Sequence, residues 1–206
     1  MWRFAPFADF FQRLLDHPLV SDAVLINNDP QLTPEHILLR HPKLLVLNFG
    51  RNIFVNPAWN VGVAHCRSSL VCIMNDDIVF DTRLFSRVLK WYQPGFGCVG
   101  LNSSSPVDGD IWFEPHSNQS CFGFGQLMFV HQNNWLHIPP DLLVYFGDNW
   151  IFDTHKKRWG SNYLIRNLLH VTPHAQTSRE QAPRLEQERT VYSQVLLTHA
   201  LPNSHG

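Results

Sequence analysis

Apolar residues follow two distinct spacings along the chain. Between residues 4 and 15 they recur at helical intervals, and the His17-Pro18 pair ends this predicted helix because a residue before proline disfavours the helical conformation. Elsewhere the apolar residues are consecutive, which indicates strands buried on both faces. Strands are predicted on this basis at residues 23–26, 44–47, 70–74, 98–101 and 126–131.

Helices are expected between these strands, at residues 34–40, 56–66 and 82–91. Asn56 is the predicted N-cap of the second of these helices, with Pro57 at its first position. Strands that alternate with helices favour an α/β domain with a mostly parallel sheet.

The second half of the chain is less regular. Residues 103–114 are rich in Ser, Pro, Asp and Gly and predict a loop. Beyond it we expect strands of mixed direction. The elements predicted there are a short helix at 147–157, one or two strands within 162–169 and a charged helix at 178–200.

Polar residues follow three of the predicted strands, where each strand ends. They are Asn27-Asn28-Asp29, Asn48 and Asn75-Asp76-Asp77. The carboxyl ends of parallel strands meet at one crevice, which is where ligands bind in α/β sheets. Adjacent carboxylates after an apolar strand repel each other unless a positive group lies among them, and a bound cation is one solution. An Asn-Asp-Asp sequence can also be a turn that caps the next helix.

The composition supports a folded protein and limits the classes of partner that it is expected to bind. The 206 residues are 44% hydrophobic and 13% aromatic, which suits a single domain with a substantial core. A net charge of -1 gives no reason to expect nucleic acid as a partner. The sequence contains no apolar run of the roughly 20 residues that a transmembrane segment needs, and no signal-peptide layout at its start.

The cysteines favour a reducing, cytoplasmic location. The four cysteines include no Cys-x-x-Cys pair, and Cys72 lies inside an apolar strand where it would act as a small hydrophobe. Four cysteines could in principle also form two disulfide bridges.

Three segments carry a resemblance to a known family. They are Val24-Leu-Ile-Asn-Asn-Asp29, the stretch from Asn48 to Gly62 with Asn52 and Asn60, and Asn75-Asp76-Asp77 in the position of an Asp-x-Asp motif. With them, most of the chain resembles the metal-dependent glycosyltransferases of the GT-A fold, particularly the inverting family 2. The resemblance implies a Rossmann-like α/β fold, a nucleoside diphosphate sugar donor such as a UDP-sugar, and a glycan or other hydroxyl acceptor.

The resemblance also implies a metal site. It assigns Asp77 to the metal and leaves Asn75 or Asp76 for the ribose, and Asn75 departs from the family, which has Asp at that position. The segment His174-Ala-Gln-Thr-Ser178 resembles the family's His-x-x-Thr-Ser, which makes His174 the expected third ligand and His170 its competitor. An imidazole with carboxylate and phosphate oxygens suits Mn²⁺ or Mg²⁺, which would neutralise the diphosphate leaving group.

Two further segments resemble the family's donor and acceptor sides. Gly123 and Gly125 lie where missing side chains would let the donor sugar approach the backbone, although two glycines before a strand also mark a bulge. Asp148, in Tyr145-Phe-Gly-Asp-Asn-Trp150, would be the general base that takes a proton from the acceptor hydroxyl. The alternative is that Asp148 caps the helix that follows.

The remaining donor contacts implied by the resemblance lie in the first 60 residues. Three of them have a plainer alternative: Asn28 and Asp29 can form a turn after the strand, and Asn60 can pack a helix against the sheet. Family members begin with a central strand, and here only residues 1–3 precede Phe4, so the chain is a fragment or keeps only a remnant of that strand. If that strand is absent, its neighbours lose ladder partners. The contacts are Trp2, Arg3, Asn28, Asp29, Asn52 and Asn60.

We therefore expect one glycosyltransferase-like domain, which could be a module of a larger protein. Its expected parts are a nucleotide-binding half (1–102), an acceptor and metal half (103–178), and a C-terminal helix and tail (179–206). One alternative is a non-catalytic module of the same fold that binds a nucleotide sugar or glycan. A nucleotidyltransferase is a weaker alternative, because the sequence lacks a Gly-rich, Lys/Arg-bearing phosphate loop near its start.

Overall fold

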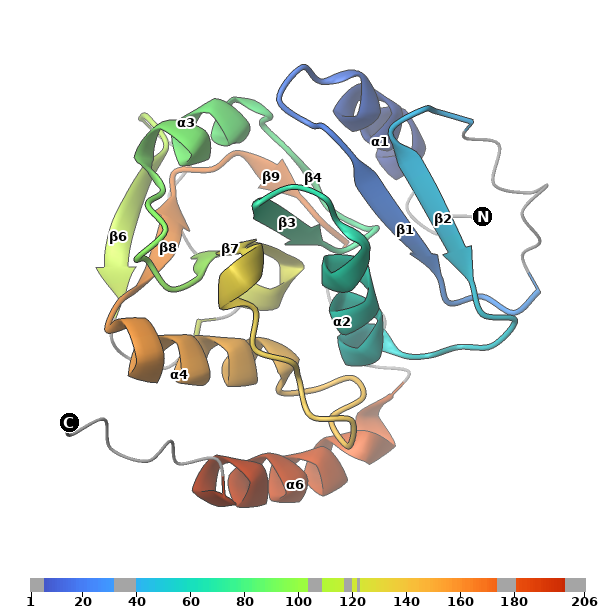
Figure 1. Cartoon of the computed structure of the whole chain (residues 1–206), viewed down its shortest axis with the longest axis vertical. Helices are drawn as coiled ribbons and strands as arrows, with labels where there is room; N and C mark the ends of the chain where they lie inside the picture. Colours follow the sequence, from blue (N-terminus) through green and yellow to red (C-terminus); the bar gives the residue numbers. More distant parts are fainter. Residues whose placement is uncertain are drawn as a thin grey trace.

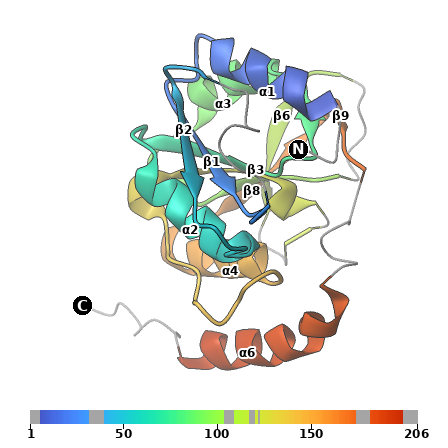
Figure 2. The same ribbon diagram turned by 90° about the vertical axis from the view of Figure 1, so that its right-hand side faces the viewer.

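The protein has a mixed α/β fold in which helices flank a central sheet, as expected (Figure 1). The computed structural model describes residues 6–31, 40–103, 109–116, 120–121, 123–173 and 181–198. The α-helices are α1 (Pro6–Asp16), α2 (Val55–His65), α3 (Arg83–Trp91), α4 (Gly147–Trp159) and α6 (Leu185–Thr198). Short 3₁₀ turns are η2 (Phe124–Gln126), η3 (Gln132–Asn134) and η4 (Ala182–Arg184). In both views α1 and α6 lie at opposite ends of the molecule (Figure 2).

The strands of the described residues form three sheets. The largest has the order β3-β7-β5-β8-β6, built from β3 (Leu70–Met74), β7 (Leu127–His131), β5 (Val99–Leu101), β8 (Asn162–Arg166) and β6 (Trp112–His116). A separate parallel pair is β1 (Ala23–Asn27) with β2 (Leu44–Asn48), and a short antiparallel pair is β4 (Val79–Phe80) with β9 (His170–Val171). Within the large sheet only β5 and β8 are parallel. Every antiparallel pair includes β6, β7 or β9, from the half where mixed directions were expected.

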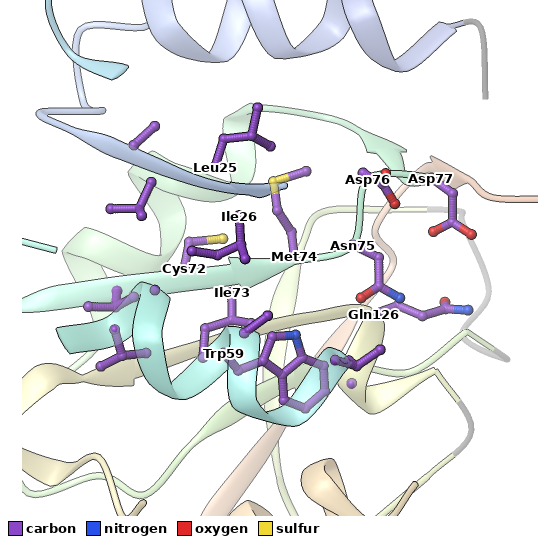
Figure 3. Close-up of a pocket in the computed structure, with 18 of the residues that line it drawn as sticks. Leu25, Ile26, Trp59, Cys72, Ile73, Met74, Asn75, Asp76, Asp77 and Gln126 are labelled. Carbon is purple, nitrogen blue, oxygen red and sulfur yellow. The ribbon is translucent and has the colours of Figure 1, made fainter. Parts of the chain in front are cut away.

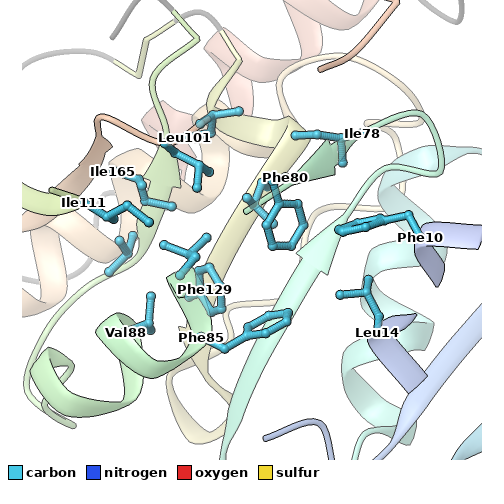
Figure 4. Close-up of a cluster of buried hydrophobic side chains, with 14 of the residues drawn as sticks. Phe10, Leu14, Ile78, Phe80, Phe85, Val88, Leu101, Ile111, Phe129 and Ile165 are labelled. Carbon is cyan, nitrogen blue, oxygen red and sulfur yellow. The ribbon is translucent and has the colours of Figure 1, made fainter. Parts of the chain in front are cut away.

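Two apolar clusters cover the two faces of the large sheet. One contains side chains of α1 and α3, with edge-to-face contacts such as that between Phe10 and Phe80, whose ring centroids are 5.0 Å apart (Figure 4). The other contains side chains of α2 and α4. Strand β7 alternates between them, because Leu127 and Phe129 belong to the first cluster and Met128 and Val130 to the second. Burial on both faces explains why its sequence is continuously apolar.

Some sequence predictions need correction. The predicted loop at 103–114 was wrong at its end, because β6 begins at Trp112. It is an edge strand paired only with β8 in the described sheet, which is why it tolerates Pro115, a residue that cannot donate to a ladder. The predicted N-cap was also wrong, because α2 begins at Val55 after Phe54 and has no side-chain cap. The helix expected at 34–40 falls on residues outside the described ranges, apart from residue 40.

His155 makes the stability of the fold sensitive to acid. It lies on α4 with its side chain fully buried, 4.8 Å from the ring of Trp159 between centroids, and neither ring nitrogen has a hydrogen-bond partner among the described residues. Burial lowers the pKa of His155 from 6.5 to about 3. The folded protein therefore binds this proton only at much lower pH than the unfolded chain does.

We expect acid to destabilise the protein through His155. As the pH falls below 6.5, His155 binds a proton in the unfolded chain but stays neutral in the folded protein. The free energy of unfolding therefore drops by up to about 1.4 kcal/mol per pH unit. Urea unfolding at pH 7.5 and pH 5 should show a smaller loss for His155→Phe than for wild type. The exposed His65 provides the control, and His65→Phe should match wild type. An equal acid loss in all three proteins would contradict the assignment.

Candidate active site

A cavity of about 1350 Å³ opens at the carboxyl ends of β1 and β3 (Figure 3). It is lined by strand-end residues, by η2 and by the start of α4. The predicted site residues that it brings together are Asn28, Asp29, Asn52, Asn75, Asp76, Asp77, Gly123, Gly125 and Asp148. Asn48 and Asn60 do not line it. Trp2, Arg3 and His174 lie outside the described residues.

The loop after β1 is held by its own amide and carboxylate side chains. Asn28 accepts a hydrogen bond from the Ile53 amide (3.1 Å) and donates one to the carbonyl of Phe54 (3.2 Å). Asp29 accepts one from the Gln31 amide (2.9 Å), which is a turn contact. Asn52 accepts one from the Phe54 amide (2.7 Å), so three predicted donor residues also shape the cavity wall.

Asn60 makes its contacts away from the cavity. Its side chain is buried, donates to the carbonyl of Ile138 (2.9 Å) and accepts from the Trp135 indole (3.1 Å) and the Ile138 amide (3.0 Å). These bonds tie α2 to the chain after η3, whereas the packing role considered from the sequence placed Asn60 between the helix and the sheet.

The acidic residues after β3 face the cavity beside η2. The Asn75 amide donates to the carbonyl of Gln126 (3.1 Å), which fixes the end of the strand. Asp76 is exposed and Asp77 is half-buried, and both lie beyond Met74 at the rim (Figure 3). One or two carboxylates together with substrate phosphates are a usual ligand set for Mg²⁺, so these side chains fit a divalent ion.

The described residues do not complete a protein-only metal site. Among them no group of three or more His, Cys, Asp or Glu side chains is placed to hold an ion. His170 lies on β9, where its Nδ1 is 2.9 Å from the carbonyl of Leu168, and it does not line the cavity. Pro173 does line it, and the next residue in the chain is His174.

Both predicted glycines are fixed by close packing. Gly123 has φ of +87°, and a Cβ atom there would lie 1.8 Å from Oγ of Ser103. A Cβ atom on Gly125 would lie 2.9 Å from Cβ of Asp148. The missing side chain of Gly125 therefore lets α4 bring Asp148 against η2.

Asp148 is the second residue of α4 and not its cap. The helix begins at Gly147, after Phe146 in the left-handed region (φ 59°), and Asp148 accepts a hydrogen bond from the Asn149 amide (3.0 Å). Burial raises the pKa of the Asp148 carboxyl, with backbone N–H groups opposing the shift. A carboxyl with a raised pKa is better suited to take up a proton near neutral pH.

The loop before α4 is tied to α2 by Asn56. This fully buried residue donates from Nδ2 to the carbonyls of Leu142 (3.2 Å) and Tyr145 (3.0 Å). Gly147 allows this approach, since a Cβ atom there would lie 2.0 Å from Oδ1 of Asn56. Asn56 was predicted as a helix cap and instead joins segments 86 and 89 residues apart.

Glu188 of α6 also binds this loop, a role that was not predicted from the sequence. Its carboxylate is only 3% exposed and accepts hydrogen bonds from the amides of Leu143 (3.1 Å), Val144 (3.0 Å) and Tyr145 (2.8 Å). The one sequence signal is its position four residues before Tyr192, which also faces inward and stacks on Phe146 (centroids 5.1 Å apart).

Comparisons with known proteins support the fold. No protein-family model and no curated protein matches the sequence. Solved structures do match. One is S. aureus TarS 1-349, with a TM-score of 0.57 and 11% identity, covering 82% of this chain and 55% of that one. Another is GalNAc-T7 with UDP, GalNAc and Mn²⁺, with a TM-score of 0.51 and 13% identity, covering 74% of this chain and 38% of that one.

The chain has a glycosyltransferase fold. This confirms the fold expected from the sequence. The chain spans about half the length of the TarS structure and less than half of the GalNAc-T7 structure. Among the described residues, no helix combines the length and apolar character needed to cross a membrane.

Removing the Glu188 carboxylate should loosen the loop that leads to Asp148. Glu188→Ala leaves three backbone amides without their acceptor in a partly buried place, so we expect the free energy of unfolding to fall by about 3 kcal/mol. Hydrogen exchange at residues 143–145 should accelerate. Glu186→Ala is the matched control, because Glu186 is exposed on the same helix and pairs only with Arg189 in the described ion pairs. Similar losses in both variants would contradict a stabilising role for the hydrogen bonds between Glu188 and residues 143–145.

Proposed function

We propose that the protein is a glycosyltransferase that moves a sugar from a nucleoside diphosphate sugar, such as a UDP-sugar, to a hydroxyl group of a glycan or another acceptor. The observation that carries the proposal is that Asp76, Asp77 and Asp148 line one cavity at the strand ends of a glycosyltransferase fold. The solved GalNAc-T7 structure contains UDP, GalNAc and Mn²⁺, which supports this class of donor.

Asp77 would hold Mn²⁺ or Mg²⁺, and His174 would add a nitrogen ligand from the segment that follows Pro173. Asn75 or Asp76, beside Asp77, would contact the ribose. The bound ion would act as a Lewis acid that offsets the charge of the departing diphosphate. Asn28, Asp29 and Asn52 would contact the nucleoside from the opposite wall, where their side chains already fix the loop after β1. All three residues line the cavity.

Asp148 would act as the general base. As the acceptor oxygen forms its bond to the anomeric carbon, the bond from that carbon to the diphosphate oxygen breaks on the opposite face, and the hydroxyl proton passes to the Asp148 carboxylate. Attack opposite the leaving group inverts the configuration. The raised pKa of Asp148 supports this role, because the carboxylate binds the proton more readily than an exposed one would.

A second candidate is a module of the same fold that binds a nucleotide sugar without transferring it. Asn75 favours it, since an amide stands where the motif has its first acid. The two candidates share donor binding and differ in the need for Asp148.

UDP binding should depend on a divalent ion through Asp77. Calorimetry should show that Asp77→Asn lowers the affinity for UDP at least about tenfold when Mn²⁺ is present and leaves it unchanged in chelator, because a metal ligand is lost while the side-chain shape is kept. Asp110→Asn, at an exposed position outside the cavity, should behave as wild type. Equal affinities for wild type and Asp77→Asn with and without Mn²⁺ would remove Asp77 from the metal site.

Asp148→Asn should separate enzyme from binding module. We expect sugar transfer to fall by about 10² to 10⁴ while UDP affinity stays the same, because the side chains are nearly isosteric and only the base is lost. The variant should not be less stable than wild type at neutral pH. The raised pKa of Asp148 means that the folded protein favours the protonated carboxyl. The stability that the protonated carboxyl contributes is lost as the pH rises through the pKa of the folded state.

The exposed Asp141 provides the control for this measurement, and Asp141→Asn should transfer at the wild-type rate. Full activity of Asp148→Asn would exclude Asp148 as the base. Tight UDP-sugar binding by wild type without transfer to any member of a broad acceptor panel would favour the binding module.

A further inference from the structure

Helix α4 lies between the large sheet and α6 in both views of the molecule (Figure 1, Figure 2). Its first turn carries Asp148, which packs so closely on η2 that a Cβ atom on Gly125 would lie 2.9 Å from Cβ of Asp148. This contact limits how far α4 can approach η2, but it does not keep α4 from moving away. Contacts on the other side of α4 are therefore needed to hold Asp148 in place.

Tyr192 of α6 contacts α4 at two places. Its ring stacks on the ring of Phe146, with centroids 5.1 Å apart and planes inclined by 14°. Its hydroxyl donates a hydrogen bond to the carboxylate of Asp153. Burial and this hydrogen bond raise the pKa of the Tyr192 hydroxyl, so the hydroxyl keeps its proton and remains a donor.

The two contacts lie on the side of α4 that faces away from Asp148. Phe146 begins the helical hydrogen bonding, since its carbonyl accepts from the Trp150 amide (2.8 Å), and Asp153 follows it by seven residues, close to two helical turns. At about 100° per residue, Asp148 lies about 200° around the helix from position 146 and about 140° from position 153. The first two turns of α4 are therefore held between Tyr192 on one side and Gly125 on the other.

We propose that Tyr192 is a positioning residue for the general base, because its contacts with Phe146 and Asp153 keep α4, and with it the Asp148 carboxyl, against η2. The inference rests on the function proposed above, in which Asp148 takes the acceptor proton. Tyr192 does not line the cavity, so it acts through α4 and not on the acceptor. Movement of α4 away from η2 would admit water to Asp148 and separate its carboxylate from the acceptor hydroxyl.

Removal of the Tyr192 hydroxyl tests the proposal through the rate of transfer. Tyr192→Phe keeps the stacked ring and loses the bond to Asp153. We expect kcat to fall about tenfold or more while the affinity for UDP stays the same, because a displaced base slows the reaction without changing the donor contacts. Asp153→Ala removes the same bond, so this variant and the double variant should lose no more than Tyr192→Phe. Asp153→Asn keeps an acceptor oxygen and should retain most of the rate.

Val195→Ala is the matched control for a general loss of stability. Val195 lies on the same helix and packs, partly buried, against the same apolar cluster as Tyr192. Its truncation should lower the urea midpoint of unfolding and leave kcat at the wild-type value when all variants are folded. The proposal is overturned if Tyr192→Phe keeps the wild-type kcat, or if Val195→Ala loses as much rate as Tyr192→Phe does.

The pKa of Asp148, measured by carbon-13 NMR titration, is a second readout and needs no acceptor. Burial raises this pKa. The titratable groups that interact with the Asp148 charge are Cys98, Cys121 and Tyr192, and burial raises the pKa of each, so all three are uncharged at neutral pH. Replacing Tyr192 therefore changes no charge beside Asp148, and a lower pKa would report the entry of water.

Tyr192→Leu removes both contacts and should lower the pKa of Asp148 toward its ordinary value, whereas Val195→Ala should leave it as in wild type. If Tyr192→Leu does not fold, Tyr192→Phe should show a smaller shift in the same direction. An unchanged pKa of Asp148 in the folded Tyr192 variants overturns the proposal. If wild type binds UDP and transfers no sugar to any acceptor, the proposed function fails, and the titration still decides whether Tyr192 holds Asp148 against η2.

Discussion

The antiparallel pairing of β3 with β7 is the constraint on which the candidate site depends. In this pairing Met74, the last residue of β3, lies opposite Leu127, the first residue of β7. The acidic residues after β3 and the glycine turn before β7 therefore meet at the same edge of the sheet. Because Gly125 in that turn contacts Asp148, the register of β3 with β7 also brings the start of α4 close to the acidic residues after β3.

Close packing at small residues determines how α4 approaches this edge. Gly125 and Gly147 lie where a Cβ atom would collide with Asp148 and Asn56, so η2, α2 and α4 converge without intervening side chains. Phe146 adopts a left-handed conformation between them, at a cost of about 1 to 3 kcal/mol. Stacking of its ring on Tyr192 of α6 offsets part of that cost. The position of Asp148 thus results from contacts among segments that are distant in the sequence.

The sequence predicted what local pattern determines and missed what distant contacts determine. Strands such as β7 were evident because burial on both faces leaves an uninterrupted apolar run, and the strand-end acids followed from them. Edge strand β6 has a partly exposed sequence that includes Pro115, and β4 and β9 have only two residues each, so none of the three shows a hydrophobic period. Asn56 and Glu188 have ordinary helical neighbours, and their roles arise from partners more than forty residues away. The metal and donor roles remain proposals, since His174, Trp2 and Arg3 lie outside the described residues.

Asn56 and Glu188 hold the loop of residues 142–145 through its main chain. Their hydrogen bonds therefore do not constrain the side chains of that loop. Both residues bind only its main-chain carbonyls and amides, which every sequence without proline there would present equally. These contacts therefore fix the backbone conformation of the loop independently of the side chains that it carries. Substitutions at Val144 or Tyr145 can alter the wall of the cavity next to Asp148 while the path of the backbone stays the same. A loop built in this way can diverge in what it recognises without first having to acquire a new fold.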